Sequence, residues 1–125
     1  MAHRNEFIEY LLEQMQAVGE ATGGVSARAM FGGYGLYFHD TLSQEHFMFA
    51  LVADDVLYLK TDENSRPEFE ERGLKAFTYE RNRKPFSMSY NEAPGEVLDD
   101  PEEMTLWANK AIDAARRNLT KKRSR

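Results

Sequence analysis

Residues 30–38 read MFGGYGLYF and hold three glycines within four positions. Glycine inside a strand-like stretch costs stability, so this backbone needs residues without a Cβ. The stretch lacks the GxGxxG and GxxxxGK[ST] spacings of phosphate-binding loops, and it leads into a strand rather than a helix. We therefore predict a bend or β-bulge between two strands. In that bend Gly32 and Gly33 supply positive φ, and Gly35 leaves room for a neighbouring backbone.

Alternating apolar and polar residues extend on both sides of the glycines. Alternating or apolar runs typical of strands occupy residues 25–31, 35–39, 46–53, 56–60, 76–82 and 85–91. The Asp54-Asp55 pair predicts a tight hairpin between two of these runs. Pro85 opens the last run and places it at or near a sheet edge, because proline has no N–H to donate.

Three segments have the spacing and caps of helices. Apolar residues recur at helical intervals over about residues 4–19. A second helix begins with a capping box at Ser65 and is ended by Gly73. A third begins after the N-cap Asp100 and runs to about residue 118.

These elements give the order α-β-β-β-α-β-β-α, an α+β fold with a largely antiparallel five-stranded sheet and flanking helices. Residues 1–118 are expected to form a single domain, and residues 119–125 a basic flexible tail. The chain has 125 residues, which is enough for one proper core.

Composition excludes several classes of protein. The chain has no cysteine, which rules out disulfides, thiolate chemistry and cysteine-bound zinc. No apolar run is long enough to span a bilayer, and the first ten residues lack the order of a signal peptide. We expect a cytoplasmic protein without a membrane partner.

Charge is unevenly distributed along the chain. Residues 116–125 hold six of the 16 basic side chains and no acidic one, so residues 1–115 carry ten basic and 21 acidic side chains. An acidic body repels a phosphate backbone, which argues against direct DNA binding by the folded part. Nucleic-acid contact through the 116–125 tail is kept as an alternative function.

No group of residues has the spacing of an active site. His39 and His46 are expected to face each other across a hairpin mouth, a polar tip rather than a zinc site. We predict no catalytic residue, no metal and no cofactor. The alternative is a small-ligand-binding protein or enzyme with a pocket beside the Gly32–Gly35 bend. The candidate interaction or pocket residues are Arg28, Tyr34, Tyr37, His39 and Tyr90.

Several stretches together resemble one family. MFGGYGLYF, FALVADDVLYLKTDE, AFTYER, MSYNEAP and LDDPEEMTLWANKAIDAA follow in the order and spacing of the N-terminal domain of the TfoX (Sxy) competence regulators. The resemblance runs from about Ser26 to Arg117. It implies an α+β fold with a curved antiparallel sheet.

The resemblance also implies a function. TfoX proteins are non-enzymatic bacterial regulators that promote the expression of DNA-uptake genes for competence (DNA transformation), together with a cyclic-AMP-responsive transcription factor. Their C-terminal helical domain has no counterpart in this sequence, so a stand-alone N-terminal domain is expected. We predict a module that binds another protein, such as that factor or another regulator. A homodimer is also expected, because exposed aromatic sheet surface tends to be an interface.

Overall fold

The computed structural model describes residues 5–19, 22–30 and 32–123, which form one antiparallel sheet with helices packed on it. In chain order the elements are α1 (Glu6–Gln14), β1 (Gly23–Met30), β2 (Gly33–Asp40), β3 (Glu45–Ala53), β4 (Val56–Lys60), α2 (Arg66–Glu71), β5 (Ala76–Arg81), β6 (Lys84–Glu92), the 3₁₀ turn η1 (Gly95–Leu98) and α3 (Pro101–Arg123). The predicted α+β class is confirmed.

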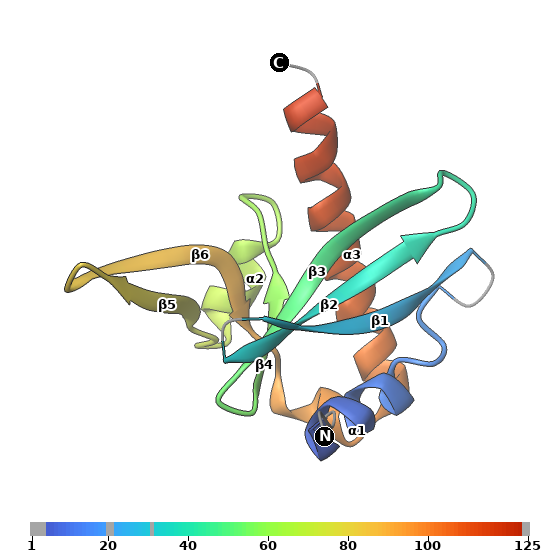
Figure 1. Ribbon diagram of the computed structural model, residues 1–125, viewed down its shortest axis with the longest axis horizontal. Coiled ribbons are helices and arrows are strands. Elements are labelled where there is room, and N and C mark those ends of the chain that lie inside the picture. The colour runs from blue at the N-terminus through green and yellow to red at the C-terminus, as the bar shows by residue number, and fades with distance from the viewer. Residues whose placement is uncertain (1–4, 20–21, 31, 124–125) are drawn as a thin grey trace.

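The sheet has six strands in the order β1-β2-β3-β4-β6-β5, so the predicted count of five is wrong. Four strands precede α2, whereas the predicted order allowed three: each of the six strand-like runs of the sequence forms its own strand, since the turn at Asp54-Asp55 separates β3 from β4. All strand pairs are antiparallel, as predicted. Figure 1 shows the sheet twisted and curved, with the β5–β6 hairpin projecting away from the rest.

Two tight turns have the same backbone geometry. Asp54 and Asp55 have φ values of 50° and 58°, and Asn82 and Arg83 have values of 53° and 64°. Positive φ at both central residues defines the type I′ turn, whose twist matches that of a two-stranded hairpin. Aspartate and asparagine tolerate this conformation better than most residues. The hairpin predicted at Asp54-Asp55 is therefore confirmed.

The glycine stretch forms the reversal between β1 and β2. Gly32 has a φ of +79°, as predicted, but Gly33 does not adopt positive φ. A Cβ on Gly33 would lie 2.2 Å from the carbonyl oxygen of Val52, so this residue is the one that allows a neighbouring backbone to approach. A Cβ on Gly35 would instead meet side chains, with the Met48 sulfur at 2.8 Å. The predicted roles of Gly33 and Gly35 are thus corrected, and the register shift in this part of the sheet lies further on, between Leu36 and Tyr37.

Pro85 lies on β6, which is an interior strand by order because β5 forms that edge of the sheet. However, β4 pairs with β6 only at residues 90–92. At Pro85 the strand therefore pairs with β5 on one side and is not paired with β4 on the other. The edge-like character predicted from the proline holds locally, although the strand itself is not the outermost.

The helices lie on one face of the sheet, where α3 packs against β3 and β4 and α1 packs against β1 and α3 (Figure 1). The core forms between them. Its largest fully buried side chains include Phe38, Phe49, Phe69, Ile8 and Met104. Burial of such side chains supplies most of the stabilisation, at about 1.5–3 kcal/mol for each.

Helix ends differ from prediction in three places. Helix α1 ends at Gln14 and is followed by turns up to Gly19, and α3 continues to Arg123 instead of ending near residue 118. Residues 119–123, expected in the tail, are thus helical. The Ser65 side chain does not cap α2 and instead accepts a hydrogen bond from the Asp62 N–H at 3.1 Å.

The other predicted helix boundaries agree with the structure. The Asp100 carboxylate accepts from the Glu102 N–H at 3.0 Å, which confirms it as the cap of α3. Gly73 ends α2 with a φ of +72°. Among the described residues, no helix combines the length and apolar character needed to cross a bilayer.

Candidate functional site

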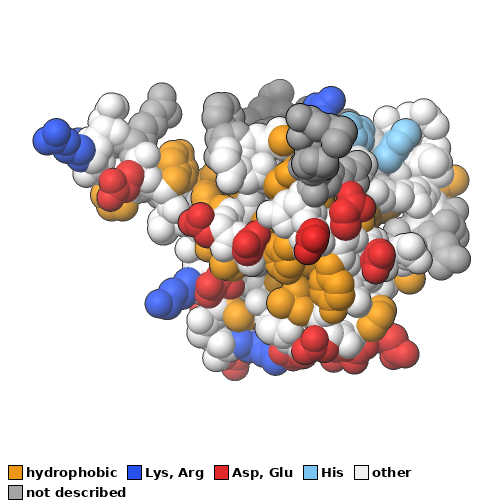
Figure 2. Space-filling view, turned by 60° about the horizontal axis from the view of Figure 1, so that its bottom comes forward, with side chains coloured by type: hydrophobic (Ala, Val, Ile, Leu, Met, Phe, Trp, Pro, Cys, Tyr) orange, Lys and Arg blue, Asp and Glu red, His pale blue; other side chains and the backbone are white. Residues whose placement is uncertain are grey.

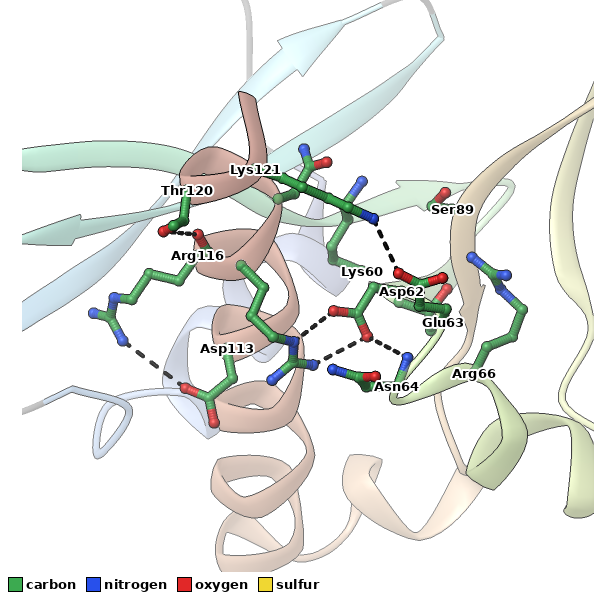
Figure 3. A pocket seen from close by; sticks show the side chains of 13 residues that line it. Lys60, Asp62, Glu63, Asn64, Arg66, Ser89, Asp113, Arg116, Thr120 and Lys121 are labelled. Atoms are coloured by element: carbon green, nitrogen blue, oxygen red, sulfur yellow. Dashed lines mark hydrogen bonds and ion pairs between the residues drawn. The ribbon is translucent and has the colours of Figure 1, made fainter. Parts of the chain in front are cut away.

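A pocket of about 780 Å³ opens beside the C-terminal half of α3 (Figure 3). Its other walls are the segment that joins β4 to α2 and Ser89 of β6. Eight charged side chains line it: Lys60, Arg66, Arg116, Arg117, Lys121, Asp62, Glu63 and Asp113. Cations exceed carboxylates by two, in a chain whose formal net charge is −5.

The strongest ion pair of the pocket joins Asp62 to Arg117. The Arg117 Nε donates to one carboxylate oxygen at 2.5 Å and a terminal nitrogen donates to the other at 3.0 Å. The Ser65 N–H also donates to this carboxylate, at 3.0 Å. The hydrogen bonds from Arg117 lower the pKa of Asp62 to about 2, and burial opposes them only in part. This pair fastens the β4–α2 segment to α3.

Two further ion pairs continue along the same helix. Lys121 reaches Glu63 at 3.0 Å, although both side chains are largely exposed. Arg116 donates to the buried Asp40 at 2.7 Å. Burial alone would raise the pKa of Asp40, but hydrogen bonds from the Leu42 and Ser43 N–H groups and from Arg116 hold it below its usual value. Arg116 also lies 3.9 Å from Asp113, so it serves two carboxylates.

The face of the sheet opposite α3 forms a second candidate surface, which we call the open face. Its side chains alternate with the buried ones along each strand. The open face comprises Arg28, Tyr37, His39, His46, Met48, Tyr58, Phe77, Tyr79 and Met88. Tyr79 and Met88 are 39% and 38% exposed.

Aromatic rings lie in contact over much of the open face. Tyr37 stacks on His46 with ring centroids 5.2 Å apart, and Arg28 lies 5.8 Å from the Tyr37 ring. On the β4–β5 side, the Tyr58 and Phe77 rings meet edge to face at 4.9 Å. Tyrosine, methionine and arginine are the residue types enriched in protein interfaces.

The candidate residues of the sequence are divided by the sheet. Arg28, Tyr37 and His39 lie on the open face, whereas Tyr34 packs towards the core on the helix side. Tyr90 pairs with Lys60 across β6 and β4 and lies on the open side of the sheet with Tyr58, with the Lys60 nitrogen 5.1 Å from its ring, but it is only 5% exposed. Burial, with a smaller contribution from Tyr37, raises the pKa of Tyr90 to about 12. None of these five residues lines the pocket beside α3.

His39 and His46 pair across β2 and β3, with ring centroids 5.8 Å apart. The prediction that they face each other is confirmed. Within residues 5–19, 22–30 and 32–123, no three His, Cys, Asp or Glu side chains gather closely enough to hold a metal ion. The His46 ring contacts both the His39 and the Tyr37 rings.

Sequence reasoning missed the pocket. Arg116 and Arg117 fall at the predicted end of the third helix and in the basic 116–125 run, and the sequence pattern predicts no site at Asp62 and Glu63. In the sequence the pocket corresponds to a basic run near the C-terminus and an acidic segment whose residues pair with it from 55 to 58 positions earlier. Such long-range pairing cannot be read from spacing alone.

Acidic side chains dominate a different surface, at the other end of α3. Figure 2 shows many of them around an apolar patch on that side of the molecule. Helix α1 begins with Glu6 and Glu9, and the first turn of α3 contains Glu102 and Glu103. The two ends of α3 thus present opposite charge.

A profile of the TfoX N-terminal domain matches residues 13–115. The chain belongs to the TfoX N-terminal domain family. The match begins earlier than the resemblance read from the motifs, which started at about Ser26, and it includes the second half of α1. A search of curated proteins found no match to this TfoX-type chain.

Proposed function

We propose that this TfoX-type domain is a non-enzymatic bacterial regulatory module that works in the cytoplasm by binding another protein through its open face. The observation that carries the proposal is the cluster of aromatic and methionine side chains on the open face. Surface of this kind is costly to leave in water unless it serves an interaction.

Family membership points to the kind of process. TfoX competence regulators act in DNA transformation with a cyclic-AMP-responsive transcription factor, so transcription regulation is the process we propose for this chain. The partner is then such a factor or another regulator. Direct DNA binding is a weaker candidate, because Arg116, Arg117 and Lys121 are already paired with carboxylates.

The experiment measures binding of the full chain to the cyclic-AMP-responsive transcription factor of the same organism, by isothermal titration. The double variant Tyr79→Ala/Met88→Ala removes two exposed side chains of the open face and is expected to weaken binding at least tenfold. The matched control is Leu106→Ala, since Leu106 is 52% exposed but lies on α3. Equal affinity of the double variant and wild type would reject the open face as the binding surface.

The open face is also where we expect self-association. The mass of wild type and of Tyr79→Ala/Met88→Ala is measured by light scattering at micromolar concentration. A dimer that dissociates in the double variant supports a homodimer through this face. A monomeric wild type would reject the homodimer, and the open face would remain proposed as the binding surface for a different protein.

A further inference from the structure

The two edges of the sheet, β1 and β5, differ in how well they are protected against a further strand. Strand β5 has six residues, two of which are charged, Glu80 and Arg81. Strand β1 has eight residues, contains no proline and carries a single charged side chain, Arg28. Short length, charge and proline are the features that usually prevent an edge strand from pairing. By this comparison β1 is the edge that is open to another strand.

The backbone groups of β1 that point away from β2 follow from the strand pairing. The Thr41 N–H donates to the Thr22 carbonyl at 2.6 Å, and these residues continue the register of β1 with β2. Hydrogen-bonded and non-hydrogen-bonded residue pairs alternate along an antiparallel pair of strands. The odd-numbered residues of β1 therefore direct their N–H and C=O groups outwards. The Gly23 N–H agrees with this assignment, since it donates to the Gly19 carbonyl and not to β2.

Val25, Ala27 and Ala29 are thus left with outward-facing N–H and C=O groups. Over the part of the chain that the structure describes, no second strand and no loop hydrogen-bonds to them. Figure 1 shows β1 along the outer side of the sheet. No residue of β1 is buried, whereas several residues of the neighbouring β2 are. This edge is therefore accessible to a backbone that offers complementary groups.

We propose that a second copy of this chain adds its own β1 to this edge, antiparallel and about a two-fold axis at Ala27. In that register Ala27 lies opposite Ala27 of the other copy, and Val25 lies opposite Ala29. The three residue pairs exchange two hydrogen bonds each, which satisfies the outward N–H and C=O groups of all three residues in both copies. The outward groups are symmetric about Ala27, so the edge is complementary to itself.

The side chains of β1 suit the same register. On the helix side, Val25 and Ala27 already pack against the core, and pairing extends this apolar row across the two-fold axis. On the other side, Arg28 lies opposite Ser26, so no two like charges face each other directly. The pairing uses the edge of the sheet and leaves the open faces of both copies side by side. It therefore goes beyond the function proposed for that face and does not depend on it.

The test measures the mass of the full chain by sedimentation equilibrium from micromolar to submillimolar concentration, and wild type is expected to dimerise. Ala27→Pro removes one outward N–H but none of the hydrogen bonds to β2, and it should weaken dimerisation at least tenfold. The matched control is Thr78→Pro on β5. The Thr78 N–H also points outwards, because Arg81 and Lys84 form the hydrogen-bonded pair beside the two-residue turn. This control should change dimerisation less than twofold.

Hydrogen exchange of wild type gives a second readout, which decides the question even if Ala27→Pro does not fold. The amides of Val25, Ala27 and Ala29 should exchange more slowly as the dimer forms, because they are then hydrogen-bonded. Three results would overturn the proposal: a wild type that stays monomeric, a dimer that Ala27→Pro leaves unchanged, or a dimer in which these amides exchange as fast as in the monomer.

The same measurements separate the edge from other ways of association. A dimer that dissociates in Tyr79→Ala/Met88→Ala but not in Ala27→Pro would assign self-association to the open face and reject pairing through β1. Protection of the three edge amides in a monomeric chain, seen only when the transcription factor is added, would assign the edge to a strand of that partner. Either result would exclude a second copy as the occupant of this edge.

Discussion

The two halves of α3 are held to the rest of the molecule by different forces. Residues 101–115 pack on the sheet through apolar side chains, among them Met104, Trp107 and Ala111, which are almost fully buried. Residues 116–121 instead reach the neighbouring segments through Arg116, Arg117 and Lys121. One helix thus changes from core element to charged pocket wall, and the first half should supply most of its stability.

The largest expected effect is at the apolar half. Trp107 is 4% exposed and its ring meets that of Phe69 edge to face at 5.2 Å. Trp107→Ala leaves a large cavity and should lower the free energy of unfolding by about 3–5 kcal/mol. Chemical denaturation measures this loss. The neighbouring Leu106→Ala serves as control, because its exposed side chain should change stability by only about 0.5 kcal/mol. Similar losses in both variants would contradict the assignment of the core face.

The second effect is at the junction of the halves. Arg116→Ala removes the cation that faces the buried carboxylate of Asp40 and also the contacts of its guanidinium with the Phe38 and Phe47 rings. The melting temperature should fall by less than in Trp107→Ala but by more than for any exposed ion pair. Asp113→Asn is the control, because this carboxylate is 62% exposed and lies 3.9 Å from Arg116, farther than the 2.7 Å that separates Arg116 from Asp40. An unchanged melting temperature in Arg116→Ala would show that this junction contributes nothing.

A third effect depends on pH. The pKa of Asp62 falls from 3.8 to about 2 in the folded chain, because Arg117 hydrogen-bonds its carboxylate. The charged form is therefore favoured by folding, and the stability it adds is complete above the unfolded pKa and is lost as pH falls through the folded one. Asp62→Asn should lose less stability than wild type between pH 4 and pH 2. Melting curves at a series of pH values give the comparison, and parallel pH profiles would contradict it.

The smallest expected effect is at the end of the helix. Lys121 and Glu63 are 70% and 74% exposed, and a pair so open to water contributes about 0.5 kcal/mol or less. Lys121→Ala should therefore leave the denaturation midpoint almost unchanged at ordinary ionic strength. A loss comparable to that of Arg116→Ala would show that the charged half of α3 is held as firmly as its apolar half.

Several local features of this TfoX-type domain could be predicted from the sequence, because they depend on residues that are neighbours in the chain. The cap at Asp100, the end of α2 at Gly73 and the hairpin at Asp54-Asp55 each follow from the conformations that those residues prefer. The prediction at Ser65 failed for a related reason. Asp62, three residues earlier, forms the competing turn with the Ser65 N–H, and Arg117 fixes its carboxylate from a distant part of the chain.

The sequence by itself determined the α+β class, the antiparallel strands and the family, because alternation and turn chemistry act over a few residues. Only the tertiary structure decided the place of β6 beside β4, the open face and the pocket beside α3. These depend on pairs far apart in the chain, such as Asp62 with Arg117 and Asp40 with Arg116. Such pairs form only once folding of the sheet and α3 has brought their segments together, so the spacing of residues in the sequence does not predict them.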